Sequence, residues 1–500
     1  MKRYGVLALF AFAVLAGAAV MLGGLNQDEG WYLYAANLVA EGKMPYRDFF
    51  YTQGPLLPLV YSAFTPAWET LGLLGGRLVT VAIGFLSIVF AAALARLLAP
   101  EGRKREAGVI AFMLLSCNLY HVYYLSIPKT YALAAFFAIM GFYLLAFALR
   151  RLQPNAPDGS RFVPAVFLFV SGLTMSFAAG ARISLGFLLA VVGFALLFAF
   201  RRFKWSFLWF GLGGAFGLAA VYGPILADRV AFEGLCAAQQ YHAARGGFDP
   251  IFTVGSLSRL VRWYLPVFIL AGLGLAENRF VPAFRRPAVF HLLPLAFLAV
   301  FLVQMLAPFP YEDYQVPIMA FLAVWAAVAS AKVPHVLLLT LGLTWAASFG
   351  SPLLERWTTN GQDRLWTVKK EKTELKQLQD VARAINLLDP GGKTLLTQDL
   401  YLAIESGRKV PEGLEMGPFS ILSDEQWRKL LDEAPCEIAA LSGYTFSVNP
   451  PVCDERPIGQ QVAYWKLLKT RYDTILREEA FGQNATTLMI LRRKAPGRDE

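Results

Sequence analysis

About eleven apolar runs, each roughly 17 to 25 residues long, dominate the first 350 residues of this chain. An α-helix of that length crosses the hydrocarbon core of a bilayer, at 1.5 Å of rise per residue. The mean hydropathy of +0.46 agrees with lipid as the main solvent. We therefore expect an all-α polytopic membrane bundle of about eleven transmembrane helices. The runs lie at 4–25, 72–99, 107–127, 129–149, 162–181, 183–200, 206–227, 259–277, 288–307, 314–331 and 333–350.

The charges between these runs predict an orientation. Basic residues gather in one alternating set of loops, at 2–3, 103–105, 150–151, 201–204, 279–286 and 332. The other set holds ten of the 14 acidic residues of this half. Basic loops mark the cytoplasm, so we expect a cytoplasmic N-terminus in a plasma (inner) membrane, with a retained first helix. Eleven spans then place the C-terminus outside the cytoplasm.

The net charge of +10 is explained by the same loops. Residues 1–350 carry 25 Lys and Arg and 14 Asp and Glu, whereas residues 351–500 carry 21 and 22. The excess of base therefore belongs to membrane orientation, and we expect membrane lipids but no nucleic acid as partners.

After residue 350 the sequence changes character, and we predict a second domain. We expect residues 1–350 to form the transmembrane domain and residues 351–500 a small, soluble, extracytoplasmic α/β domain. Helix-patterned stretches lie at 363–388, 424–433 and 459–478, and β-rich stretches at 394–397, 438–441 and 486–491. An extracytoplasmic compartment would also permit a disulfide between Cys436 and Cys453.

Two adjacent carboxylates, Asp28 and Glu29, follow the first apolar run and precede several aromatic residues. Such a pair can coordinate a divalent cation such as Mg²⁺ or Mn²⁺, or act as a general base. It can also bind sugar hydroxyls while the aromatic rings stack on the sugar. Alternatively, Asp28 caps a helix over 29–41, which is compatible with the chemical roles.

Other charged groups lie at the ends of later runs. Glu312 and Asp313 precede the tenth run and Tyr314 begins it, and a solvated turn is the alternative interpretation there. Lys129 and Arg182 lie at the outer ends of runs, where positive charge is not expected from the orientation. Cations there can hold a lipid phosphate or pyrophosphate group. The alternative is snorkelling toward lipid headgroups.

These motifs resemble the membrane glycosyltransferases of the GT-C fold, above all the dolichyl-phosphate-mannose protein mannosyltransferases and the bacterial aminoarabinose–lipid A transferases. The resemblance rests on the stretch Asp28-Glu29-Gly30 with Tyr32 and Ala35, on Gly42-x-x-Pro45-Tyr46 with Asp48, and on Gly54-Pro55-Leu56. Tyr311-Glu312-Asp313-Tyr314-x-x-Pro317 is similar to the (His/Arg)-Tyr-x-x-Pro element of that group. Asp313 stands where many members carry a basic residue.

The resemblance implies an inverting hexosyl- or pentosyltransferase. A sugar would pass from a polyprenyl-phosphate donor to a lipid, glycan or protein acceptor at the outer face of the membrane. Asp28 would serve as general base or polarise the acceptor hydroxyl, and Glu29 would help to hold the acceptor or a cation. Cationic groups would stabilise the departing phosphate, and from the topology we expect these to be Lys129 and Arg182. The other substrate-binding residues implied are Tyr32, Asp48, Glu312, Asp313 and Tyr314.

Two other functions share this topology: a transporter or flippase for lipid-linked sugars, and an oligosaccharide polymerase or ligase. Transporters place ionisable residues near the bilayer midplane and often contain inverted repeats. The acidic residues here cluster in outer loops and the sequence shows no internal repeat, which favours the transferase.

Overall fold

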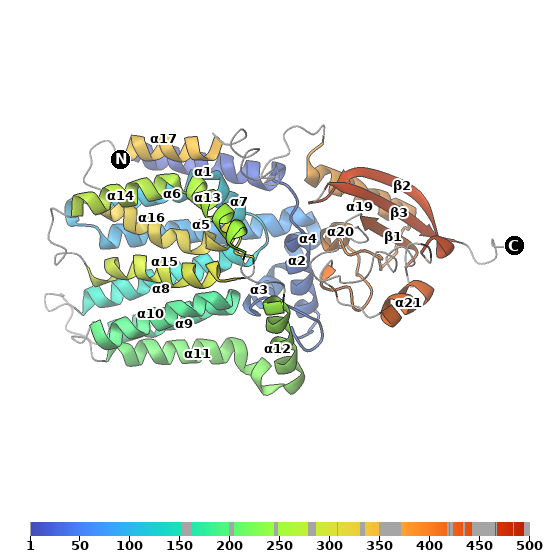
Figure 1. Ribbon diagram of the computed structural model, residues 1–500, viewed down its shortest axis with the longest axis horizontal. Coiled ribbons are helices and arrows are strands. Elements are labelled where there is room, and N and C mark those ends of the chain that lie inside the picture. The colour runs from blue at the N-terminus through green and yellow to red at the C-terminus, as the bar shows by residue number, and fades with distance from the viewer. Residues whose placement is uncertain are drawn as a thin grey trace.

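The computed structural model describes residues 2–152, 162–199, 205–244, 249–278, 287–307, 309–330, 336–349, 372–417, 420, 424–433, 436–442, 466, 468–483 and 485–494. Apolar helices lie side by side in a bundle, and the C-terminal helices and strands pack against one end of it (Figure 1). The first helix begins at the opposite end of the bundle (Figure 1).

Seven helices in the described part of the chain are long and apolar enough to cross a membrane, so the protein is a multi-pass membrane protein. Six of them are α1 (Lys2–Leu22), α5 (Leu73–Leu98), α8 (Thr130–Arg151), α9 (Phe162–Ala181), α11 (Ser206–Ala227) and α15 (Ala288–Met305). The seventh is α16 (Val316–Ser330), continued by the 3₁₀ turn that starts at Glu312.

The remaining predicted runs form shorter or broken helices, for local reasons. The pair α13 (Pro250–Trp263) and α14 (Leu265–Asn278) is bent by 78°, next to Pro266, which cannot donate a helical hydrogen bond. The run 107–127 divides at Asn118, whose side chain accepts from the His121 amide and starts a new helix. The described spans number seven, or eight with the bent pair, and eleven stays a prediction. The shorter helices are α6 (Lys104–Ser116), α7 (Leu119–Tyr124), α10 (Gly186–Phe194) and α17 (Val336–Phe349).

Four helices outside the bundle lie at the end that faces the C-terminal elements (Figure 1). All four come from the two long loops between the first and second runs and between the seventh and eighth. They are α2 (Gln27–Ala40), α3 (Leu56–Tyr61), α4 (Thr65–Leu71) and α12 (Arg229–Ala244). The acidic loops expected on one side of the membrane therefore gather at one end of the molecule.

The described C-terminal elements include three helices and a small antiparallel sheet. Strand β3 lies in the centre, with Ala440 of β1 opposite Ile490 and Arg477 of β2 opposite Met489. All five residues of β1 are buried, so it forms the inner edge of the sheet. The elements are α19 (Glu374–Leu388), α20 (Leu400–Ser406), α21 (Asp424–Glu433), β1 (Ile438–Ser442), β2 (Tyr472–Phe481) and β3 (Thr486–Arg493).

Several expectations for this region are confirmed and one is wrong. The helix at 424–433 and the strands at 438–441 and 486–491 are present. The helix predicted over 459–478 is wrong from residue 472, because this segment pairs with β3 as a strand. Residues 394–397 form only isolated bridges, such as Leu396 with Ala439. Cys453, the expected partner of Cys436, lies outside the described residues.

Candidate active site

The first turn of α2 is capped by Asn26, which leaves the Asp28 side chain free for another role. The Asn26 side chain accepts a hydrogen bond from the Asp28 amide at 3.1 Å, and the Glu29 carboxylate accepts from the Asn26 amide at 3.0 Å. This is a capping box that begins one residue before the helix. The alternative interpretation of Asp28 as the N-cap is therefore wrong.

Asp28 instead belongs to a buried charge cluster with Lys129. The Lys129 Nζ atom lies 2.9 Å from Asp28 Oδ2 and 3.2 Å from Asp313 Oδ2. The hydroxyl of Tyr131 donates to the same Asp313 oxygen at 2.9 Å. Two carboxylates share one ammonium group, so the positive charge of Lys129 is already balanced. The Asp28 side chain keeps 25% of its surface exposed, against 8% for Lys129.

Arg182 is held in a different way, by aromatic rings. Its guanidinium carbon lies 4.4 Å from the ring centre of Tyr314 and 5.1 Å from that of Tyr131, within the range of cation–π attraction. Among the residues that the structure describes, no carboxylate forms an ion pair with Arg182, and its buried Nε has no hydrogen-bond partner. The stacked guanidinium therefore offers its charge and donors to an anion.

These groups surround a cavity of about 300 Å³. Five of the residues expected from the sequence line it: Asp28, Tyr32, Lys129, Arg182 and Tyr314. Most of the remaining wall consists of aromatic and neutral polar side chains, which suit a sugar with its hydroxyls and its flat carbon face. They include Trp31, Thr52, Gln53, Tyr131, Ser184, Gln239, Tyr241, Gln304 and Phe309.

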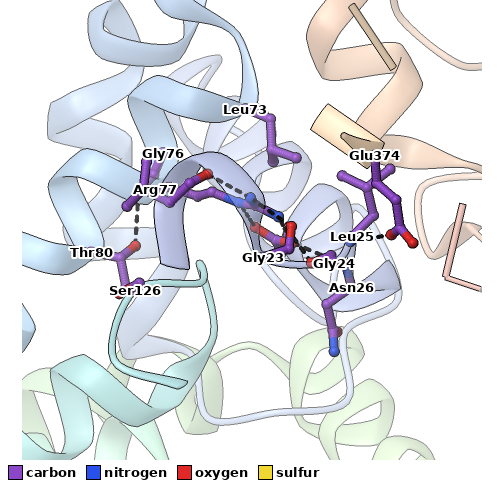
Figure 2. A network of polar contacts seen from close by, with 12 residues as sticks. Gly23, Gly24, Leu25, Asn26, Leu73, Gly76, Arg77, Thr80, Ser126 and Glu374 are labelled. Carbon is purple, nitrogen blue, oxygen red and sulfur yellow. Dashed lines mark hydrogen bonds and ion pairs between the residues drawn. The ribbon is translucent and has the colours of Figure 1, made fainter. Parts of the chain in front are cut away.

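Glu29, expected beside Asp28 in the same site, faces away from the cavity. Its two carboxylate oxygens each lie 2.7 Å from nitrogens of Arg77, and both side chains are fully buried. Arg77 also donates to the carbonyls of Val20, Gly23 and Gly24 at the end of α1. Figure 2 shows Arg77 reaching from α5 toward this turn. The carboxylate of Glu29 is thus committed to joining α1, α2 and α5.

Three further expected residues do not line the cavity. Glu312 pairs with Arg259 at 3.0 Å and accepts from Ser256 at 3.2 Å. Asp48 pairs with its neighbour Arg47 at 2.8 Å on the exposed loop surface. Asp313 is connected to the cavity through Lys129.

Two residues that organise the site through long-range contacts, Tyr131 and Arg77, are not among those expected from the sequence. Tyr131 supports both Asp313 and Arg182, yet a tyrosine near the start of an apolar run carries no distinctive signal. Arg77 had one: it is an arginine inside the apolar run 72–99, and intramembrane charges are rare unless paired.

The described residues do not fit a Mg²⁺ or Mn²⁺ ion at the Asp28–Glu29 pair. The charge nearest Asp28 is the ammonium of Lys129, and Glu29 is saturated by Arg77. Nor does any group of three His, Cys, Asp or Glu come together elsewhere in the described part of the chain.

The comparison with known proteins finds solved structures of similar fold but no protein of similar sequence. No protein-family model matches the chain, and no curated protein sequence matches it. The structure is similar to that of ArnT from Cupriavidus metallidurans bound to undecaprenyl phosphate, with a TM-score of 0.62, 13% identity and 99% of each chain covered. The apo state of ArnT also gives a TM-score of 0.62, at 13% identity and 98% coverage of both chains.

The archaeal oligosaccharyltransferase AglB from Archaeoglobus fulgidus, in complex with an inhibitory peptide and a dolichol-phosphate, is more distant. Its TM-score is 0.50 at 11% identity, over 88% of this chain and 70% of that one. The GT-C fold expected from the sequence is confirmed.

Proposed function

We propose that the protein is a membrane glycosyltransferase that moves a sugar from a polyprenyl-phosphate donor to a lipid, glycan or protein acceptor. One observation carries the proposal: Asp28 and Arg182 face the same aromatic-lined cavity. Asp28 is held beside Lys129, and Arg182 lies over the rings of Tyr131 and Tyr314. Sugar transfer from a phosphate needs a base for the acceptor and a cation for the leaving group.

Asp28 is the base in this reaction. Lys129 lies 2.9 Å from the Asp28 carboxylate, and this partly exposed carboxylate can accept a proton from an acceptor hydroxyl. The acceptor oxygen bonds to the anomeric carbon as the bond from that carbon to the phosphate oxygen breaks. Attack from the face opposite the phosphate inverts the anomeric configuration, and the polyprenyl phosphate leaves with the electron pair.

Arg182 is the group that binds the phosphate. The positive charge of Lys129 is shared by Asp28 and Asp313, whereas Arg182 lies over two tyrosine rings and forms no ion pair with a carboxylate among the described residues. A guanidinium fork matches two phosphate oxygens, and rings that fix its plane reduce the entropy lost on binding. Charge that develops on the departing phosphate would therefore be stabilised by Arg182.

The structural neighbours agree with this donor class, since ArnT was solved with undecaprenyl phosphate and AglB with a dolichol-phosphate. The transferred sugar would be a hexose or a pentose, and the protein would act in the plasma membrane. Residues 1–350 would form the transferring domain, and residues 351–500 would lie outside the cytoplasm with the cavity. No step of the proposed reaction passes through a divalent cation, because the charges beside Asp28 and Glu29 come from Lys129 and Arg77.

The test is a transfer assay with the purified full-length chain, a panel of polyprenyl-phosphate sugars, and lipid, glycan and peptide acceptors. We expect product with one donor, and loss of that product in Arg182→Gln. Arg150→Gln is the matched control, because Arg150 lies on the exposed surface beside Glu101. Movement of the donor across vesicles without any transfer would refute the enzyme and favour a flippase.

A further inference from the structure

Three side chains of the C-terminal segment, meaning the described residues from 372 onward, hold the turn at Leu25–Gln27 that precedes Asp28. Glu374 of α19 accepts the backbone N–H of Leu25 at 2.7 Å, as Figure 2 shows. Gln483 accepts the backbone N–H of Gln27 at 2.7 Å. Asp399 accepts from the side chain of Gln27 at 2.8 Å. These partners lie between 349 and 456 residues away in the chain.

Most of this contact is dry. Glu374, Asp399 and Gln27 are 2%, 1% and 5% exposed. Asp399 also accepts from the hydroxyl of Tyr401 at 3.1 Å. Buried hydrogen bonds to charged acceptors are stronger than exposed ones, and removal of one partner leaves a buried polar group unsatisfied. The turn is therefore held more firmly than an exposed loop.

The contact with the C-terminal segment also explains why residue 30, in the Asp28-Glu29-Gly30 motif, is a glycine. A Cβ at this position would overlap the backbone nitrogen of Tyr401 and the carbonyl carbon of Leu400. The backbones of α2 and α20 thus touch, and only glycine permits the approach. One face of α2 rests on the C-terminal segment while Asp28 reaches Lys129 in the bundle.

We infer that the C-terminal segment is a working part of the active site, with Glu374, Asp399 and Gln483 as positioning residues for Asp28. The inference rests on the proposed function, because it assigns these residues to the reaction that Asp28 performs. None of the three lines the cavity, so they act through the turn at Leu25–Gln27. A displacement of about 1 Å at a reacting group can lower a rate about 100-fold.

The activity test compares two substitutions at one position. Asp399→Leu removes the acceptor for Gln27, whereas Asp399→Asn keeps an oxygen there. We expect Asp399→Leu to lower kcat at least about 10-fold with the donor KM within about 2-fold, and Asp399→Asn to restore most of the rate. Lys409→Met is the control, because its exposed ion pair with Glu41 joins the same segment to the far end of α2.

Gln483→Ala is a milder variant that guards against loss of folding, and Gly30→Ala tests the close approach of α2 to α20. Gln483 is exposed, so Gln483→Ala leaves the Gln27 amide to water and should lower kcat several-fold in a folded protein. Gly30→Ala should lower kcat strongly, whereas Gly17→Ala in α1, where an added Cβ meets no atom within 4 Å, should not.

Hydrogen–deuterium exchange of the full-length protein in detergent tests the contact without any substrate. The amides of Leu25 and Gln27 should be protected in the wild type and should exchange faster in Asp399→Leu and Gln483→Ala. Faster exchange with unchanged kcat, or unchanged exchange with lowered kcat, would overturn the positioning role. A wild-type protein that transfers no sugar would refute the proposed function instead, and the exchange result would still show whether the segment holds the turn.

Discussion

Replacing Glu29 with glutamine should destabilise the protein by about 3 to 5 kcal/mol, the range for removing one partner of a buried ion pair. Both side chains are fully buried, and two of the Arg77 nitrogens lie 2.7 Å from Glu29 oxygens. In Glu29→Gln an amide NH₂ would face a guanidinium N–H, donor against donor, and the charge of Arg77 would remain unpaired in a dry site.

Arg77→Met should be at least as harmful. It leaves the carboxylate of Glu29 buried without a counter-charge, and it also removes the donors for the carbonyls of Val20, Gly23 and Gly24. Each buried group left unsatisfied adds about 1 to 3 kcal/mol. The double variant Glu29→Gln/Arg77→Met should be more stable than Arg77→Met, because no charge is left unpaired.

Thermal unfolding of purified protein in detergent measures these differences. Glu101→Gln is the matched control: Glu101 contacts Lys104 and Arg150 at the exposed surface, and such pairs contribute about 0 to 1 kcal/mol. A Glu29→Gln protein that unfolds at the wild-type temperature yet transfers no sugar would refute this structural role. Glu29 would then have to take part in the reaction.

The other predictions concern catalysis, pH and topology. Asp28→Asn should lower turnover about 10²- to 10⁴-fold at an unchanged unfolding temperature, because Asn26 caps the helix and a general base is lost; a near-normal rate in the transfer assay would exclude the role. Arg182→Lys should raise the donor KM, since an ammonium group replaces the fork between Tyr131 and Tyr314; an unchanged KM would show that the phosphate binds elsewhere. Burial raises the pKa of Asp399, so the stability gained from its proton is complete below the unfolded value of about 3.9 and is lost as pH rises through the folded value. Unfolding temperatures should therefore show Asp399→Asn gaining on the wild type as the pH rises above about 4, and parallel curves would contradict this. A reporter that is active only in the cytoplasm should stay silent at the C-terminus, and a strong signal would mean an even number of spans.

The sequence predicted the parts of the site that local patterns encode. Apolar length located the spans, and an acidic pair after the first run pointed to Asp28. Positive charge at the outer ends of two runs identified Lys129 and Arg182, which the structure brings to one cavity. The physical reason is that positive charge is disfavoured at the outer ends of membrane helices, so a basic group found there has a partner or ligand.

Long-range pairing was beyond the same patterns. Nothing in the sequence near Glu29 shows that its partner, Arg77, lies 48 residues later. Asp28 and Glu29 are adjacent carboxylates in the same motif, so the local sequence could not show that only Asp28 faces the cavity. The strand β2 was predicted as a helix because its charged sequence, with exposed residues at most positions, lacks strand alternation; its pairing with β3 decides its conformation.

The Arg77 contacts also have a consequence for biogenesis. An arginine in an apolar helix opposes insertion, by about 2.5 to 3.5 kcal/mol at the helix centre and by less near an end, where Arg77 lies in α5. Every acceptor that Arg77 contacts among the described residues precedes it in the chain, between Val20 and Glu29. When α5 leaves the ribosome, the end of α1 and the start of α2 have therefore already been synthesised. The order of translation delivers the acceptors first, so this charge can meet its partners as α5 enters the bilayer, before any later helix exists.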